Sequence, residues 1–218
     1  MTHIFDVDYT VIKQPSALYF IQEALAQKAI GISQVCRVPL EWLRYKTGML
    51  RTDFIEEAVK HLAGMEKETL ENITAACFAG RMKAGIYEQA AQLIRELQQK
   101  GEQVIFATSS LYIMIQPLEK FLGISESLAS VLEFSQGVTT GRMKGVSLFG
   151  EKKKDAVQQW LAERSIDPHT VSFYSDSHTD IPLLEYCGCP VAVNPDRFLE
   201  RYAKKHGWQV LRFRATLG

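Results

Sequence analysis

Residues 2–10 read THIFDVDYT, in which a short apolar stretch runs directly into the acidic residues Asp6 and Asp8. The stretch 2–5 has the composition of a β-strand, so both acids are expected at the carboxyl end of a first strand. From residue 86 onwards, strand-like and helix-like stretches alternate along the chain. We expect further strands at 102–107, 171–174, 190–193 and 209–213, and helices at 86–99, 113–121, 153–164, 181–186 and 197–206. Strands that are separated by helices predict an α/β fold with a Rossmann-like, doubly wound parallel sheet.

The chain between the first strand and this alternating region is helical in character. Apolar residues recur there at spacings of three and four, for example at Leu18, Ile21 and Leu25. We therefore expect an all-helical domain at 15–85, inserted into an α/β core domain that is formed by 1–14 and 86–218. Within the core, residues 129–143 include turn glycines at Gly137 and Gly141, which predict an antiparallel excursion.

The composition excludes several classes of protein. The 218 residues are 46% apolar and 23% charged, as in ordinary globular proteins, and 25 Lys and Arg residues balance 25 Asp and Glu residues. Because there is no basic excess, we expect a small-molecule partner and no binding to nucleic acid or to a membrane. The apolar runs are far shorter than the roughly 20 residues that span a bilayer, and the first residues do not resemble a signal peptide, so a cytoplasmic location is expected. The four cysteines do not have the spacing of a disulfide framework.

Acidic and hydroxyl side chains follow several of the expected strands, at the edge where open α/β sheets bind ligands. They are Asp6, Asp8, Thr10, Thr108, Ser109, Ser110, Ser175, Asp176, Ser177 and Asp180, and Lys152, Lys153 and Lys154 lie at the start of a helix that leads to the same edge. Four carboxylates in one site would repel one another unless a cation lay among them, and a set of oxygen ligands favours Mg2+. A lysine beside that metal would complete a site for a phosphoryl group, so phosphoryl transfer is the chemistry that fits.

Four segments of the chain resemble, in the same order, the motifs of the haloacid dehalogenase (HAD) superfamily of phosphohydrolases. Asp6-Val-Asp-Tyr-Thr10 resembles the first motif, DxDx[TV], and Thr108 in VIFATSS resembles the second. The segment GEKKKDAVQQWL supplies the lysine of the third, and Asp176-Ser-His-Thr-Asp180 resembles the fourth, DSxxD. The stretch YSDSHTDIPLLEYCGCPVAVNPD looks like subfamily IB, the phosphoserine-phosphatase-like branch, whose cap is a helical insertion after the first motif. The resemblance covers essentially the whole chain.

The resemblance implies catalytic roles for these residues. Asp6 would be the nucleophile that forms an aspartyl-phosphate, and Asp8 would protonate the leaving oxygen and then deprotonate the attacking water. Thr108 would donate a hydrogen bond to a phosphoryl oxygen. The metal ligands would be Asp6, the backbone carbonyl of Asp8, Asp176 and, through water or the second shell, Asp180.

The resemblance defines the lysine and the substrate contacts less closely. The third motif aligns best on Lys153, and Lys152 or Lys154 could serve instead. The candidate substrate-binding residues are Thr10, Ser109, Thr179 and His61. His61 lies roughly where phosphoserine-specific relatives place an arginine, and an exposed position on an amphipathic helix is the other interpretation.

Two departures from the phosphoserine phosphatase pattern concern the substrate. Residues 11–15 lack the glutamate found at the entry to the cap in those enzymes, and Thr179 stands where they have asparagine. Both differences argue against phosphoserine and leave an amino-alcohol phosphate or another small metabolite phosphate open.

The expected function is Mg2+-dependent hydrolysis of a small-molecule phosphate monoester. One alternative of the same family transfers the phosphoryl group to an alcohol acceptor instead of water. A second alternative, from a different class, is a receiver-like phospho-accepting signalling module, and a third is a catalytically silent binding protein. Receivers lack a long helical insertion behind the first strand, so the order of the motifs favours the hydrolase.

Overall fold

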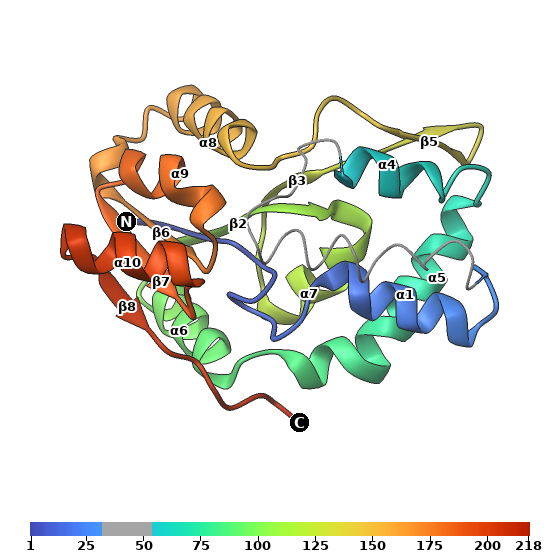
Figure 1. Ribbon diagram of the computed structural model, residues 1–218, viewed down its shortest axis with the longest axis horizontal. Helices are drawn as coiled ribbons and strands as arrows, with labels where there is room; N and C mark the ends of the chain where they lie inside the picture. Colours follow the sequence, from blue (N-terminus) through green and yellow to red (C-terminus); the bar gives the residue numbers. More distant parts are fainter. Residues whose placement is uncertain (32–53) are drawn as a thin grey trace.

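Six parallel strands form the central sheet of the computed structural model, which describes residues 1–31 and 54–218 (Figure 1). In this part of the chain the strand order is β3-β2-β1-β6-β7-β8, so the chain winds outward from β1 to β3 and then returns to continue on the other side of β1. The strands are β1 (Thr2–Phe5), β2 (Gln103–Leu111), β3 (Ser127–Ser130), β6 (Val171–Ser175), β7 (Cys189–Val193) and β8 (Gln209–Leu211). The predicted doubly wound parallel sheet is confirmed.

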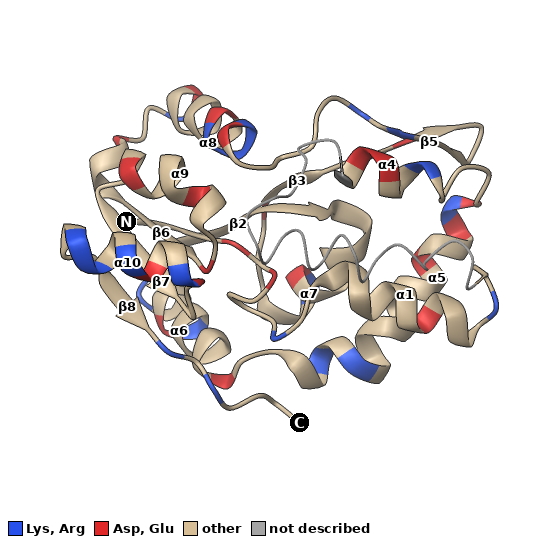
Figure 2. Ribbon diagram, in the orientation of Figure 1, with Lys and Arg blue, Asp and Glu red and all other residues tan. Residues whose placement is uncertain are grey.

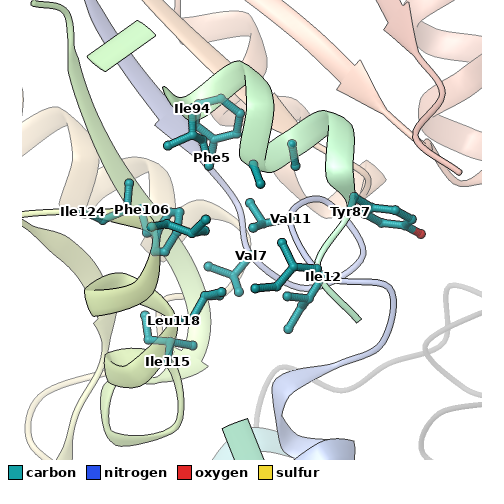
Figure 3. Packing of buried hydrophobic residues seen from close by; sticks show 14 of the residues in the cluster. Phe5, Val7, Val11, Ile12, Tyr87, Ile94, Phe106, Ile115, Leu118 and Ile124 are labelled. Carbon is teal, nitrogen blue, oxygen red and sulfur yellow. The ribbon is translucent and has the colours of Figure 1, made fainter. Parts of the chain in front are cut away.

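Helices cover both faces of this sheet (Figure 1). One face packs against α6 (Glu88–Gln99) and α7 (Tyr112–Leu122), and the other packs against α8 (Glu151–Glu163), α9 (Ile181–Tyr186) and α10 (Arg197–His206). Successive side chains of a strand point to opposite faces, so Phe106 of β2 joins the first apolar cluster and Ile105 joins the second. Figure 3 shows Ile94 of α6 beside Phe5, and Phe106 beside Ile124, within the first cluster. Burial on both faces explains the continuous apolar stretch of β2.

The register of β1 determines where the chain leaves the sheet. Phe5, the last residue of β1, pairs with Phe106 of β2 and with Tyr174 of β6. The chain therefore leaves β1 close to the end of β6. Because the direction of winding reverses between these two strands, their carboxyl ends form the edge at which such sheets bind ligands.

The described parts of the segment between β1 and α6 are mainly helical. Its described elements are α1 (Ser16–Ala26), α4 (Phe54–Lys60), α5 (Lys67–Cys77), the π-helix η1 (Phe78–Met82) and the 3-10 helix η2 (Lys83–Gly85). The helices α1, α4 and α5 share an apolar cluster with α7 and with the hairpin described below, through residues that include Phe20, Val59, Leu70, Met114 and Leu132. Residues 32–53 of the expected helical domain fall outside the described residues.

The two segments that connect the helical insertion to the α/β core lie side by side. Ile12 and Ile86 form an antiparallel bridge, with hydrogen bonds from Tyr87 N to Val11 O at 2.9 Å and from Lys13 N to Gly85 O at 2.9 Å. Because Ile86 and Tyr87 have this extended backbone, α6 begins at Glu88 and not at residue 86 as expected.

The expectation for residues 129–143 is partly wrong. The sequence predicts an antiparallel excursion there, but Ser127–Ser130 forms the parallel edge strand β3 beside β2. Only β4 (Leu132–Ser135) and β5 (Val138–Met143) form an antiparallel hairpin. The sequence SLAS of β3 is short and lacks apolar alternation, and it pairs with Phe106, Ala107 and Leu111 of β2, which extends beyond its expected end at Ala107.

Among the described helices, none combines the length and the apolar character that crossing a bilayer requires.

Candidate active site

The loop after β1 turns two acidic side chains away from the core. Asp6 N continues the strand ladder by donating to Tyr174 O at 2.9 Å. Val7 is fully buried and packs in the same cluster as Val11 and Ile12 (Figure 3). Since Val7 lies between the two acids and points into the core, Asp6 and Asp8 belong to the opposite side of the extended chain. This loop, with its acidic residues in red, lies between the sheet and α1 (Figure 2).

Lys153 joins the first and the fourth sequence motifs. Its side chain extends from the first turn of α8, is 3% exposed, and donates hydrogen bonds from Nζ to Asp6 Oδ1 at 2.9 Å and to Asp180 Oδ2 at 2.7 Å. Lys152 is exposed, and the Nζ atom of Lys154 lies 3.9 Å from Glu151 Oε2. Of the three candidate lysines, Lys153 is therefore the one that the fold brings to Asp6.

Asp180 is anchored from a second direction. It is the last residue of the 3-10 helix η4 (His178–Asp180) and is 1% exposed. Ser175 Oγ, at the end of β6, donates to Asp180 Oδ2 at 2.7 Å. The same carboxylate oxygen thus accepts bonds from Lys153 and from Ser175, which ties the start of α8 to the end of β6.

Asp8 is held by two serines from different parts of the chain. Ser16, the first residue of α1, donates from its backbone N to Asp8 Oδ1 at 2.9 Å, and Ser110 Oγ donates to Asp8 Oδ2 at 2.9 Å. The two hydroxyls also bond each other at 2.7 Å. Thr108 is buried beside them, and its Oγ1 accepts a bond from Ser110 N at 3.2 Å. Ser16 was not among the residues expected at the site; its one signal in the sequence is that it follows Pro15 at the start of an expected helix.

The predicted substrate-binding residues are linked to the site by fewer hydrogen bonds than the acidic residues and Lys153. Ser109 is half-buried beside Thr108, and its backbone O accepts a bond from Ser130 Oγ at 2.9 Å. Thr179 bonds to Ser177 through the two hydroxyls at 2.8 Å. Thr10 is fully buried, and its hydroxyl has no hydrogen-bond partner within the described parts of the chain. His61 is exposed just beyond α4, with no bond from its side chain to any described residue of the site.

The pKa values of Asp6, Asp8 and Asp176 are raised, with burial as the largest cause in each case. The pKa of Asp6 is raised to about 7, chiefly by burial; Lys153 opposes this rise, and Asp180 and Asp8 add to it. The pKa of Asp176 lies well above its usual range because the side chain is buried and close to Asp6 and Asp180. Burial also raises the pKa of Asp8, against the hydrogen bonds from Ser16 and Ser110. The pKa of Lys153 is raised because Asp180 and Asp6 outweigh the opposite effect of burial.

This arrangement fits a divalent cation. The lysine supplies one positive charge to a group of four carboxylates, and Asp6 and Asp176 repel each other. Within residues 1–31 and 54–218, no three His, Cys, Asp or Glu side chains are grouped so that they alone could hold a metal. A cation beside Asp6 and Asp176 would then complete its coordination with a carbonyl, water or phosphoryl oxygen. One or two carboxylates with such oxygens is the usual environment of Mg2+.

The family of the chain follows from comparison with known proteins. The family model for haloacid dehalogenase-like hydrolases matches residues 4–185, which include all four motifs. The chain belongs to this family. The family, the fold class and the hydrolase class expected from the sequence are thereby confirmed, and the chain is of the phosphatase type, similar to phosphoserine phosphatases.

Individual relatives resemble this HAD-family chain over almost its whole length. A Neisseria meningitidis protein named histidinol-phosphatase is 32% identical over 97% of this chain and 98% of its own length. A solved protein of unknown function from Bordetella pertussis has a TM-score of 0.86 and 26% identity, and the match covers 96% of this chain and 97% of that one. A substrate-bound phosphoserine phosphatase structure has a TM-score of 0.74 at 19% identity, over 98% and 93% of the two chains, which shows the shared fold.

Proposed function

We propose that this protein is a Mg2+-dependent phosphatase that hydrolyses a small-molecule phosphate monoester through an aspartyl-phosphate on Asp6. The observation that carries the proposal is the contact of Lys153 with Asp6 Oδ1, in a buried group that also includes Asp176 and Asp180. Lys153 engages one carboxylate oxygen, so we assign the attack on phosphorus to the other oxygen, Oδ2. This attack forms the bond from Oδ2 to phosphorus and breaks the bond from phosphorus to the ester oxygen.

Asp8 is the acid and base of the proposed reaction. Its raised pKa favours the protonated form, which the first step needs in order to transfer a proton to the leaving alkoxide. The resulting carboxylate then takes a proton from water, the hydroxide attacks phosphorus, and the bond from phosphorus to Asp6 breaks to release phosphate. The bonds from Ser16 and Ser110 hold Asp8 in one orientation through both steps.

Thr108, Lys153 and the metal ligands would stabilise the phosphoryl group. The hydroxyl of Thr108 is free to donate to a phosphoryl oxygen while its Oγ1 accepts from Ser110 N. Lys153 balances charge on Asp6 and on the phosphoryl group. Asp6, Asp176 and the carbonyl of Asp8 would hold Mg2+, with Asp180 in support, and bound Mg2+ would supply further neutralisation of phosphoryl charge.

We assign residues 15–85 to a cap domain over this site, with 1–14 and 86–218 as the core. Support comes from Ser16, because this first residue of α1, at the start of the insertion, bonds directly to the proposed acid and base. Closure of such a cap would exclude bulk water during phosphoryl transfer.

The proposed substrate class is an amino-alcohol phosphate. The Neisseria meningitidis relative named histidinol-phosphatase supports this choice because it matches the chain over nearly the full length of both proteins. The absence of a glutamate in residues 11–15 and the presence of Thr179 remain arguments against phosphoserine.

The experiment measures phosphate release by protein that has been stripped with EDTA and then supplied with Mg2+. The panel contains L-histidinol phosphate, L-phosphoserine and p-nitrophenyl phosphate, and the variants are Asp6→Asn and, as a matched control, Asp155→Asn on the exposed face of α8. We expect activity only with Mg2+, loss of at least about a thousandfold in Asp6→Asn, and wild-type rates in the control. Undiminished turnover by Asp6→Asn, or full activity after exhaustive chelation, would contradict the mechanism. A higher kcat/KM for phosphoserine than for L-histidinol phosphate would contradict the substrate class alone.

A further inference from the structure

Asp196 links the start of α10 to the loop that follows β6. One carboxylate oxygen, Oδ1, accepts bonds from the backbone N atoms of Phe198 at 2.8 Å and Leu199 at 2.9 Å, which is the geometry of a helix N-cap. The other oxygen, Oδ2, accepts two bonds from His178, from its backbone N at 2.9 Å and from its ring Nδ1 at 2.7 Å. The backbone N of Asp196 donates to Asp176 O at 2.8 Å. Asp196 thus makes three bonds to this loop, and its side chain makes two bonds to α10.

The loop that Asp196 holds contains Asp176 and Asp180. Asp180 is already anchored at the far end of the loop by Lys153 and Ser175. Asp196 anchors the near end, through Asp176 and His178. The ring of His178 also packs on Phe198 of α10, with 5.1 Å between ring centroids. The Asp176 carboxylate therefore extends from a stretch of chain that is fixed on both sides of it.

Helix capping alone does not account for these contacts. A single oxygen is enough to cap α10, and Oδ1 does so through two amide groups. The second oxygen is committed to His178, which is 18 residues earlier in the chain. Both carboxylate oxygens are thus in use, and the tie to the loop is separate from the cap.

We infer that Asp196 is a positioning residue for the site: it fixes the loop 176–180 so that the Asp176 carboxylate is held in place to bind Mg2+. This inference rests on the proposed function, since it assigns Asp196 an effect through Asp176 and not a contact with substrate. Groups that orient a metal ligand typically change metal affinity or activity by about 10-fold to 100-fold when they are removed.

The test separates the capping of α10 by Asp196 from the hydrogen bonds between Asp196 and His178. Asp196→Ser keeps a good N-cap for α10, but its shorter side chain has one oxygen and cannot also reach His178. Asp196→Ala removes both functions. Asp167→Ser makes the same substitution at another N-cap, whose side chain accepts from His169 N at 2.9 Å in the 3-10 helix η3 (Pro168–Thr170) away from the loop.

Two measurements are made on each protein: the Kd for Mg2+ by calorimetric titration of metal-free protein, and the Tm of that protein. We expect Asp196→Ser and Asp196→Ala to raise the Kd alike, by about tenfold or more. Only Asp196→Ala should also lose the cap and have a Tm lower by about 3 °C. Asp167→Ser should bind Mg2+ like the wild type.

The outcomes distinguish the inference from the function on which it rests. If Asp196→Ser binds Mg2+ as tightly as the wild type and only Asp196→Ala is impaired, Asp196 is a helix cap alone and the inference is wrong. Wild-type affinity in both variants overturns it equally. If the wild type itself binds no Mg2+ and releases no phosphate from the panel above, the proposed function fails, and the inference fails with it.

Discussion

Replacing Asp6 with asparagine should change how the stability of the metal-free protein depends on pH. Burial, supported by Asp180 and Asp8 and opposed by Lys153, raises the pKa of Asp6 to about 7 in the folded protein. Aspartate in an unfolded chain has a pKa of about 3.9, so the difference is about 3 units. Since each unit corresponds to about 1.4 kcal/mol, ionising Asp6 costs the folded state about 4 kcal/mol relative to the unfolded chain.

The direction of the effect follows from proton binding. The pKa of Asp6 is higher in the folded state, so the folded protein retains a proton that the unfolded chain loses between about pH 4 and pH 7. The resulting contribution to stability is complete below pH 4 and is lost as the pH rises through 7. About 3 kcal/mol of it is lost between pH 5 and pH 8. Asparagine does not ionise, so Asp6→Asn should become more stable relative to the wild type over this interval.

The assay is urea unfolding followed by circular dichroism, with EDTA present, at several pH values from 5 to 8. The quantity compared is the change in the free energy of unfolding across that interval for each protein. Asp155→Asn is the matched control, because Asp155 is exposed on α8 and meets water in both states. We expect its profile to follow the wild type. If the Asp6→Asn profile also parallels the wild type, Lys153 compensates the charge of Asp6 fully and the reasoning is refuted.

Two further predictions concern the charge of Lys153 and the close packing of Gly85 against Tyr19. Lys153→Met removes the charge of the buried side chain while keeping its length, and should lower kcat by about a hundredfold or more. Lys152→Met, on the exposed side of the same helical turn, should leave kcat unchanged. Equal kcat values for the two variants in steady-state assays would remove Lys153 from the mechanism. Gly85→Ala would place a Cβ atom 1.8 Å from the Tyr19 hydroxyl oxygen and should lower the free energy of unfolding by about 1–3 kcal/mol. Gly80→Ala, whose added Cβ would meet no neighbouring atom within 4 Å, should not lower it. If urea unfolding finds the two variants equally stable, Tyr19 moves aside without cost.

Much of the fold could be predicted because local signals and the global arrangement agree. The apolar stretch VIFA of β2 is buried on both faces of the sheet, and the helices that follow repeat apolar residues with helical spacing. β3 was not predicted because its four residues, SLAS, carry no comparable pattern; its position depends on pairing with Phe106, Ala107 and Leu111 of β2. The helical character of residues 54–85 was also predictable, but the extended backbone at Ile86 and Tyr87 depends on the partner segment at Val11 and Ile12.

The sequence by itself determined that carboxylates follow the strands and that a lysine opens a helix nearby, because residue type and periodicity are local properties. Which lysine reaches Asp6 depended on the rotation of α8 against the sheet, which buries Lys153 on the same face as Val157 and Trp160. The bonds from Ser16 to Asp8 and from Asp196 to the loop 176–180 join residues that meet only after the sheet has formed. Their positions are decided by strand register and helix packing, and these interactions between distant segments leave no pattern in a single sequence.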